Sequence, residues 1–155
     1  MSFNQSIIQL KFKFFNKGPL ELLYDGEVCE PDGDVYTHIE RVEFPTQLRF
    51  ELRGKDEDGA DCVVDREGNI VWDRHLKLIG ASIDGVVPNR YFLQRWPRLF
   101  VGSNTQEFRP SNQIVYANYF GFNGVIELDF DGDDVVQWLM RTHRYKDDNW
   151  QKNYD

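Results

Sequence analysis

An acidic loop is the first stretch of this sequence whose residue types could do chemistry. Carboxylates at Asp56, Asp58 and Asp61 lie on both sides of Gly59. Calcium is a hard cation that takes about six to eight oxygen ligands, and alternating carboxylates around a glycine turn can wrap one. The loop therefore predicts a calcium site at these three aspartates. The alternative is a solvated loop whose charges protect a sheet edge from aggregation.

A segment rich in arginine and aromatic residues, 88–110, is the second candidate. Arg, Tyr and Trp are enriched in the buried centres of protein interfaces, and aromatic rings also stack on sugars. The segment therefore predicts a partner-binding surface. The alternative is that its rings cover one end of the core while its arginines pair with surplus acids. The predicted contacts are Arg90, Tyr91, Arg95, Trp96, Arg98 and Phe100, with Trp150 and Tyr154 from the C-terminal end.

Catalytic motifs are missing from the sequence. The three histidines are scattered, no nucleophile-elbow motif surrounds a serine, and no glycine-rich loop could hold a phosphate. We therefore predict that the protein is not an enzyme. Cys29 and Cys62 lack the spacing of a metal site. They are either two packed thiols or one disulfide, and the sequence leaves that pairing open.

Composition restricts the classes of partner. The chain has 155 residues, of which 41% are hydrophobic and 15% aromatic, so it can bury a core and fold. A net charge of −8 is unfavourable for binding a nucleic acid backbone. No apolar run approaches the length of about 18 residues that a membrane span needs. The N-terminal residues lack the pattern of a signal peptide, so none is expected.

Alternation of apolar and polar residues predicts most of the strands. Asp25-Gly26 predicts a hairpin turn within residues 20–30, because this dipeptide favours two-residue turns. The expected strands cover residues 7–15, 35–44, 47–53, 114–119 and 125–130. Segment 88–110 is expected to be a long connection with one or two short strands and no helix.

Residues 46–87 predict the hairpin around which the rest of the chain is organised. A strand over 47–53 comes first, followed by the acidic loop and a tight turn at residues 67–69. A second, longer strand is expected over residues 74–87. It has apolar residues at both parities, which indicates cover on both faces or a bend near Gly80.

One helix is predicted near the C-terminal end. Residues 131–134 supply aspartates that can cap it, and Val135, Val136, Leu139 and Met140 follow helical spacing. Residues 145–155 are either a frayed tail or an arm that docks on a neighbour. Together the elements predict one all-β domain over residues 1–155. Its expected form is a two-sheet antiparallel sandwich or jelly roll with one short C-terminal helix, and a barrel is the alternative.

Two families resemble parts of the chain. Residues 65–70, Asp73-Arg74-His75-Leu76 and Ile83-Asp84-Gly85 are similar to the late part of calcium-dependent carbohydrate-binding β-sandwich modules. The Asp-x-x-Gly-x-Ile-x-x-Asp turn, residues 119–124 and Trp138-Leu139 resemble small β-sandwich proteins of tailed bacteriophages. The second resemblance implies a capsid-decorating, tail or baseplate accessory protein, found in the virion and made in the host cytoplasm.

The favoured hypothesis is a non-catalytic module that docks onto other virion proteins or onto further copies of itself. The alternative is a carbohydrate-binding module that takes a glycan and depends on calcium.

Overall fold

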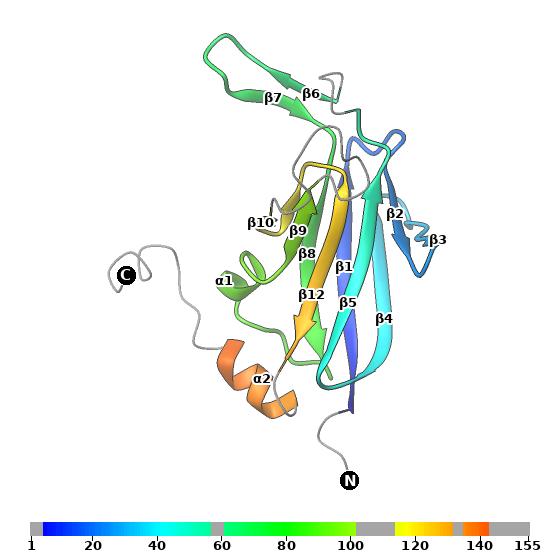
Figure 1. Ribbon diagram of the computed structural model, residues 1–155, viewed down its shortest axis with the longest axis vertical. Helices are drawn as coiled ribbons and strands as arrows, with labels where there is room; N and C mark the ends of the chain where they lie inside the picture. Colours follow the sequence, from blue (N-terminus) through cyan, green and yellow to red (C-terminus); the bar gives the residue numbers. More distant parts are fainter. Residues whose placement is uncertain (1–4, 57–60, 102–113, 132–134, 143–155) are drawn as a thin grey trace, which may run out of the picture.

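The computed structural model describes residues 5–56, 61–101, 114–131 and 135–142, which form twelve strands and two helices (Figure 1). Most of the strands belong to two antiparallel sheets that pack face to face as a β-sandwich. The predicted all-β sandwich is therefore confirmed. None of the helices in these four ranges is long and apolar enough to cross a bilayer.

The two sheets differ in size. The smaller has the strand order β11-β8-β1-β4 and contains β1 (Gln5–Phe15), β4 (Val35–Glu43), β8 (His75–Ile83) and β11 (Tyr119–Phe120). The larger has the order β10-β9-β12-β5-β2-β3 and contains β2 (Glu21–Tyr24), β3 (Glu27–Val28), β5 (Thr46–Arg53), β9 (Arg98–Val101), β10 (Ile114–Tyr116) and β12 (Gly124–Phe130). A separate hairpin of β6 (Cys62–Val64) and β7 (Ile70–Asp73) projects beyond the sandwich (Figure 1).

Alternating side chains of the long strands build the core. Ile8, Leu10, Phe12 and Phe14 of β1 are each at most 2% exposed. The even-numbered apolar residues of β5 and β12 point inward in the same way. Because successive side chains of a strand point to opposite faces, each strand gives one full row of apolar residues to the space between the sheets. The inward faces predicted for residues 7–15, 47–53 and 125–130 are confirmed.

A β-bulge interrupts β8 where the sequence indicates a bend. Lys11 of β1 is opposite Gly80, whereas the next residue, Phe12, is opposite Leu78. Ile79 is therefore the additional residue, and it is exposed. The bulge moves the buried positions from even numbers before it to odd numbers after it. This explains why the segment has apolar residues at both parities.

The predicted hairpin over residues 46–87 is wrong in its pairing. Its two long strands, β5 and β8, lie in opposite sheets. The chain crosses between the sheets by way of the small β6–β7 hairpin, whose tip holds Gly68 with φ +86°. The tight turn at residues 67–69 is thus confirmed. Alternation of apolar and polar residues shows which face of a strand is buried, but it does not show which other strand pairs with it. The sequence pattern therefore could not exclude that β5 and β8 lie in different sheets.

Two further predicted elements are divided in the structure. The strand expected over residues 114–119 is split into β10 and β11, which belong to different sheets. Segment 88–110 contains the expected strand β9 but also the one-turn helix α1 (Arg90–Leu93), which was not expected. Asn89 caps this helix, because its side chain accepts a hydrogen bond from the backbone N–H of Tyr91 at 2.7 Å.

The second helix, α2 (Val135–Thr142), confirms the predicted C-terminal helix but presents a different face to the core. Trp138 is its buried centre at 1% exposed, whereas Val136 and Met140 are exposed. The Trp138 ring lies 5.3 to 5.5 Å from the rings of Phe92, Trp96 and Phe130. This aromatic cluster closes one end of the sandwich. Of the proposed capping residues, 132–134 lie outside the described residues.

Both cysteines are free thiols. Cys29 is buried beside the six-stranded sheet, and burial raises the pKa of its thiol. Cys62 opens strand β6 and is half-buried.

We predict that Trp138→Ala lowers the free energy of unfolding by about 3–5 kcal/mol, because it removes a fully buried ring from the aromatic cluster. The matched change Val136→Ala, on the exposed face of the same helix, should change stability by less than about 0.5 kcal/mol. Urea unfolding followed by tryptophan fluorescence and circular dichroism measures both. Equal losses for the two variants would show that α2 does not pack as described.

Candidate functional site

The β6–β7 hairpin, residues 61–73 and called the arm below, is the most exposed apolar element in the described part of the chain. Cys62 pairs with Asp73, Val63 with Trp72 and Val64 with Ile70. Among the described residues its strands pair only with each other, so no described strand covers either outer edge. The exposed apolar residues, at 36–61%, are Val63, Val64, Ile70, Val71 and Trp72. Large exposed apolar side chains gathered on one small element make it a candidate interaction site.

The tip of the arm is a rigid acidic turn. One carboxylate oxygen of Asp65 accepts hydrogen bonds from the backbone N–H groups of Glu67 and Asn69, both at 2.9 Å. These bonds, with that from Asn69 first, hold the pKa of Asp65 below its usual range. The tip therefore carries two carboxylates, from Asp65 and Glu67, and one guanidinium, from Arg66.

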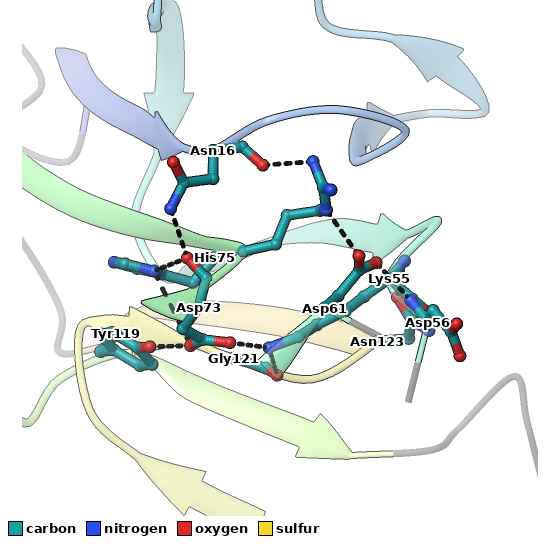
Figure 2. A network of polar contacts seen from close by, with 10 residues as sticks. Asn16, Lys55, Asp56, Asp61, Asp73, His75, Tyr119, Gly121 and Asn123 are labelled. Atoms are coloured by element: carbon teal, nitrogen blue, oxygen red, sulfur yellow. Dashed lines mark hydrogen bonds and ion pairs between the residues drawn. The ribbon is translucent and has the colours of Figure 1, made fainter. Parts of the chain in front are cut away.

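A polar cluster fixes the base of the arm to the sandwich (Figure 2). Lys55, which follows β5, donates from Nζ to the Asp73 carboxylate at 2.6 Å and to the carbonyl of Gly121 at 2.5 Å. The Lys55 and Asp73 side chains are only 4% and 5% exposed. The Tyr119 hydroxyl donates to the other Asp73 oxygen. Three separate segments of the chain thus meet at one buried ion pair.

A second ion pair closes the other strand of the arm. Asp61, just before β6, lies 2.9 Å from the guanidinium of Arg74, just before β8. Its carboxylate also accepts the backbone N–H of Asp56 at 2.7 Å. These two partners, the Asp56 N–H first, lower the pKa of Asp61. Arg74 in turn donates to the carbonyl of Asn16, which follows β1 (Figure 2).

His75 completes the base as a stacking residue. Its ring lies between Phe15, with centroids 4.6 Å apart, and Tyr119, with centroids 4.1 Å apart. Burial is the main cause that lowers the pKa of His75. A half-buried, stacked imidazole whose pKa is lowered stays neutral at physiological pH. It packs between the ends of β1 and β11, beside the base of the arm, and adds no charge.

The polar cluster positions the arm and has no free catalytic group. Each Asp73 oxygen has a partner, and so does each Asp61 oxygen. Lys55 is buried between two acceptors. Among the described residues, the role of these groups is therefore structural. They hold the two strands of the arm, β6 and β7, in place on the sandwich.

The predicted calcium ligands are only partly described. Asp58 lies outside the described residues, Asp56 is exposed, and Asp61 is buried and paired with Arg74. The guanidinium of Arg74 occupies one side of the Asp61 carboxylate with positive charge, which is unfavourable for a cation there. No group of three or more His, Cys, Asp or Glu side chains within the described ranges is arranged to hold a metal ion. Calcium binding stays a prediction.

The predicted partner-binding residues are divided by the structure. Trp96 is 9% exposed, stacks on Phe92 and donates from Nε1 to the carbonyl of Asp129 at 2.7 Å. Arg98 pairs with the Glu127 and Asp129 carboxylates at 3.2 and 2.5 Å. This is the alternative described above, in which rings cover the core and arginines pair with acids.

The other predicted contacts are more accessible. Arg90 is exposed and bonds to the hydroxyl of half-buried Tyr91 at 2.8 Å, and Arg95 and Phe100 are also half-buried. Trp150 and Tyr154 lie outside the described residues. Whether a partner binds along this segment stays a prediction.

A polar pocket of about 300 Å³ lies beside this segment. Phe92 and Trp96 form its apolar part, and Arg95, Arg98, Tyr116, Asp129 and Asp131 surround them. Tyr116 is 60% exposed, so the pocket combines an accessible ring with two acids and two arginines. Planar polar groups beside an accessible ring can bind a small polyhydroxylated ligand.

The arm was not recognised as a site from the sequence, although a signal was present. Val63-Val64 and Ile70-Val71-Trp72 are unbroken apolar runs on both sides of a turn. A hairpin with one wet face would alternate instead. Unbroken runs in such short strands mean apolar residues on both faces, and nothing in the neighbouring sequence indicates cover for either.

The sequence matches no protein-family model and no curated protein. Two solved structures of vCBM60 are similar in fold. One is a selenomethionine form, from work on circular permutation as an evolutionary link between two families of calcium-dependent carbohydrate-binding modules. It is 11% identical, covers 80% of this chain and 90% of its own, and has a TM-score of 0.41. The other is vCBM60 in complex with galactobiose, at 10% identity, 79% and 97% coverage and a TM-score of 0.34. At these scores neither structure identifies a ligand for this chain.

We predict that Lys55→Met lowers the free energy of unfolding by about 3–5 kcal/mol, because it leaves the Asp73 carboxylate buried without a cation. The double variant Lys55→Met/Asp73→Leu should recover most of that loss, since it removes both charges together. A double-mutant cycle in urea measures the coupling. Additive losses from the two single changes would mean that the ion pair does not hold the arm.

Proposed function

We propose that this chain is a non-catalytic β-sandwich module that works by docking onto another protein through the arm. The observation that carries the proposal is the arm itself: a two-stranded element with exposed apolar residues on both strands, held rigidly by buried ion pairs. A preorganised element loses little conformational entropy on binding. Trp72, at the foot of β7, is of the residue type most often found at the energetic centre of an interface.

The chemistry of the arm supports a protein partner. Burying a fully exposed large apolar side chain contributes about 1.5–3 kcal/mol. The five apolar side chains of the arm are 36–61% exposed, so each can contribute roughly half of that on binding. Its open strand edges also offer backbone N–H and C=O groups to a strand of the partner. The partner that fits is therefore an apolar surface or sheet edge.

The assembly that we propose for this docking is a virion. The resemblance to small β-sandwich proteins of tailed bacteriophages supports a capsid-decorating, tail or baseplate accessory role, with synthesis in the host cytoplasm. Arg90 is the exposed residue among the predicted contacts of segment 88–110 that the structure describes, so it is the most accessible for a second contact.

We predict that Ile70→Lys weakens binding to the partner about tenfold or more, because it puts a charge into an apolar interface. Ile70 is 58% exposed, so the fold should be retained. Tagged wild-type and variant chains are compared for the proteins that they retain from the source cells. The dissociation constant is then measured with the purified partner.

The matched control is Val136→Lys, which makes a similar change at a 52% exposed position on α2. It should retain both fold and partner. Equal affinity of the Ile70→Lys and Val136→Lys variants for the same purified partner would refute docking through the arm.

A second candidate function, carbohydrate binding, is favoured by the polar pocket around Tyr116. An accessible ring beside the Asp129 and Asp131 carboxylates and the Arg98 guanidinium offers stacking together with planar hydrogen-bonding groups. The name of one similar structure, vCBM60 in complex with galactobiose, suggests the first disaccharide to test.

We predict that, if this second function holds, a glycan found on an array binds with a dissociation constant that Tyr116→Ala raises about tenfold or more. Isothermal titration with and without EDTA then tests the calcium dependence. Tyr91→Ala, a tyrosine outside the pocket, is the matched control. An array with no ligand above background for the wild-type chain removes this candidate.

A further inference from the structure

A groove on the outer face of the four-stranded sheet lies apart from both the arm and the polar pocket. It has a volume of about 380 Å³ and lies beside the central strands β1 and β8 and the start of α1. The bulge in β8 shapes it, since Gly80 carries no side chain and Ile79 lies exposed next to it. The described lining residues include Lys11, Ile79, Gly80, Val87, Arg90 and Leu93.

The charge of the groove is opposite to that of the protein. The whole chain carries −8, yet Lys11 and Arg90 line the groove, and none of its described lining residues is a carboxylate. The remaining lining is mostly apolar, and Val87 and Ile79 are 67% and 42% exposed. The ligand that fits is an apolar segment with an acidic end.

The arm is a segment of that chemistry. Val64 and Ile70 face each other next to the tip, at 54% and 58% exposed. The tip beyond them has a net charge of −1, from Asp65, Arg66 and Glu67. Apolar side chains of the arm match the apolar lining, and the acidic tip matches Lys11 and Arg90.

The arm does not reach the groove of its own chain. It projects away from the end of the sandwich (Figure 1). The residues of β8 that line the groove, 79–82, lie further along that strand. Asp73 and Ile79 are six positions apart, which is about 20 Å along a strand. The buried Lys55–Asp73 pair holds the base of the arm in place, so the arm cannot fold back.

We propose that the arm of one copy docks into this groove on a second copy of the chain. The inference rests on the proposed function, because it takes the arm as the docking element, and it names the partner. The contact joins two different surfaces, so it is heterologous. Each copy keeps a free arm or a free groove, and repetition of the contact gives a ring or a filament.

Two variants separate the two halves of the contact. Ile70→Lys puts a cation on the arm, where it meets Lys11 and Arg90. Ile79→Glu puts a carboxylate at the groove, where it meets the acidic tip. Both positions are exposed, so the fold should survive, and urea unfolding verifies this. Val136→Lys on α2 is the control for a charge added at an exposed apolar position.

Sedimentation velocity over a concentration series is the measurement. The wild-type chain and the Val136→Lys variant should associate as concentration rises, and each of the other two variants alone should associate about tenfold or more weakly. An equimolar mixture of Ile70→Lys and Ile79→Glu should form mixed dimers at concentrations where each variant alone stays monomeric. In those dimers the intact arm of the Ile79→Glu chain occupies the intact groove of the Ile70→Lys chain.

Other outcomes overturn the inference in distinguishable ways. A wild-type chain that stays monomeric removes self-docking, and the proposed function then still stands if Ile70→Lys weakens binding to a purified partner. Association that Ile79→Glu leaves unchanged means that the groove is not the acceptor. If Ile70→Lys changes neither self-association nor partner binding, both the inference and the proposed function fail.

Discussion

The buried ion pair between Lys55 and Asp73 is the contact on which the shape of this molecule depends. It joins the end of a strand in the six-stranded sheet to the foot of the arm. Through the Tyr119 hydroxyl it also reaches β11, and through the Gly121 carbonyl the loop before β12. Removing two charges from water costs several kcal/mol, so such a pair needs full hydrogen bonding to be tolerated. Here the surrounding acceptors and donors provide it. The chain crosses from one sheet to the other through the arm, and the ion pair fixes the direction in which the arm projects.

Rigid presentation of apolar residues carries a risk that the arm itself limits. Open strand edges and exposed valines are templates for aggregation. The strands of the arm are short, its tip is charged, and Arg74 lies over the ring of Trp72 at 5.1 Å. A net charge of −8 adds general repulsion between copies. Contacts between copies are thereby limited to surfaces that offer positive charge together with apolar area.

The sequence was most informative about the fold where apolar and polar side chains alternate along a strand. The inward faces of β1, β5 and β12, the Asp25-Gly26 turn and the C-terminal helix follow from local patterns. Sheet membership does not, because β5 and β8 are successive long strands on either side of a small hairpin and yet belong to different sheets.

The candidate sites depended on tertiary partners even more. Trp96 looked like an anchor for a partner until the rings of Phe92, Phe130 and Trp138 were seen around it. Lys55 and Asp73 are 18 positions apart, and no local pattern pairs them. Asp61 is a residue type that often binds metal ions, but its carboxylate lies beside the guanidinium of Arg74. Residue types thus identified what could bind, and only packing showed which groups were already occupied.

The bulge at Ile79 lets the outer face of the sheet change without a change in the core. Inward-facing residues on both sides of the bulge pair with inward-facing residues of β1. Leu78 pairs with Phe12, and Ala81 pairs with Leu10. A single codon gained or lost at this point changes the outer face of the sheet and leaves the inner face in phase. A chain that is one residue shorter or longer here can therefore keep the same fold and have a differently shaped outer face.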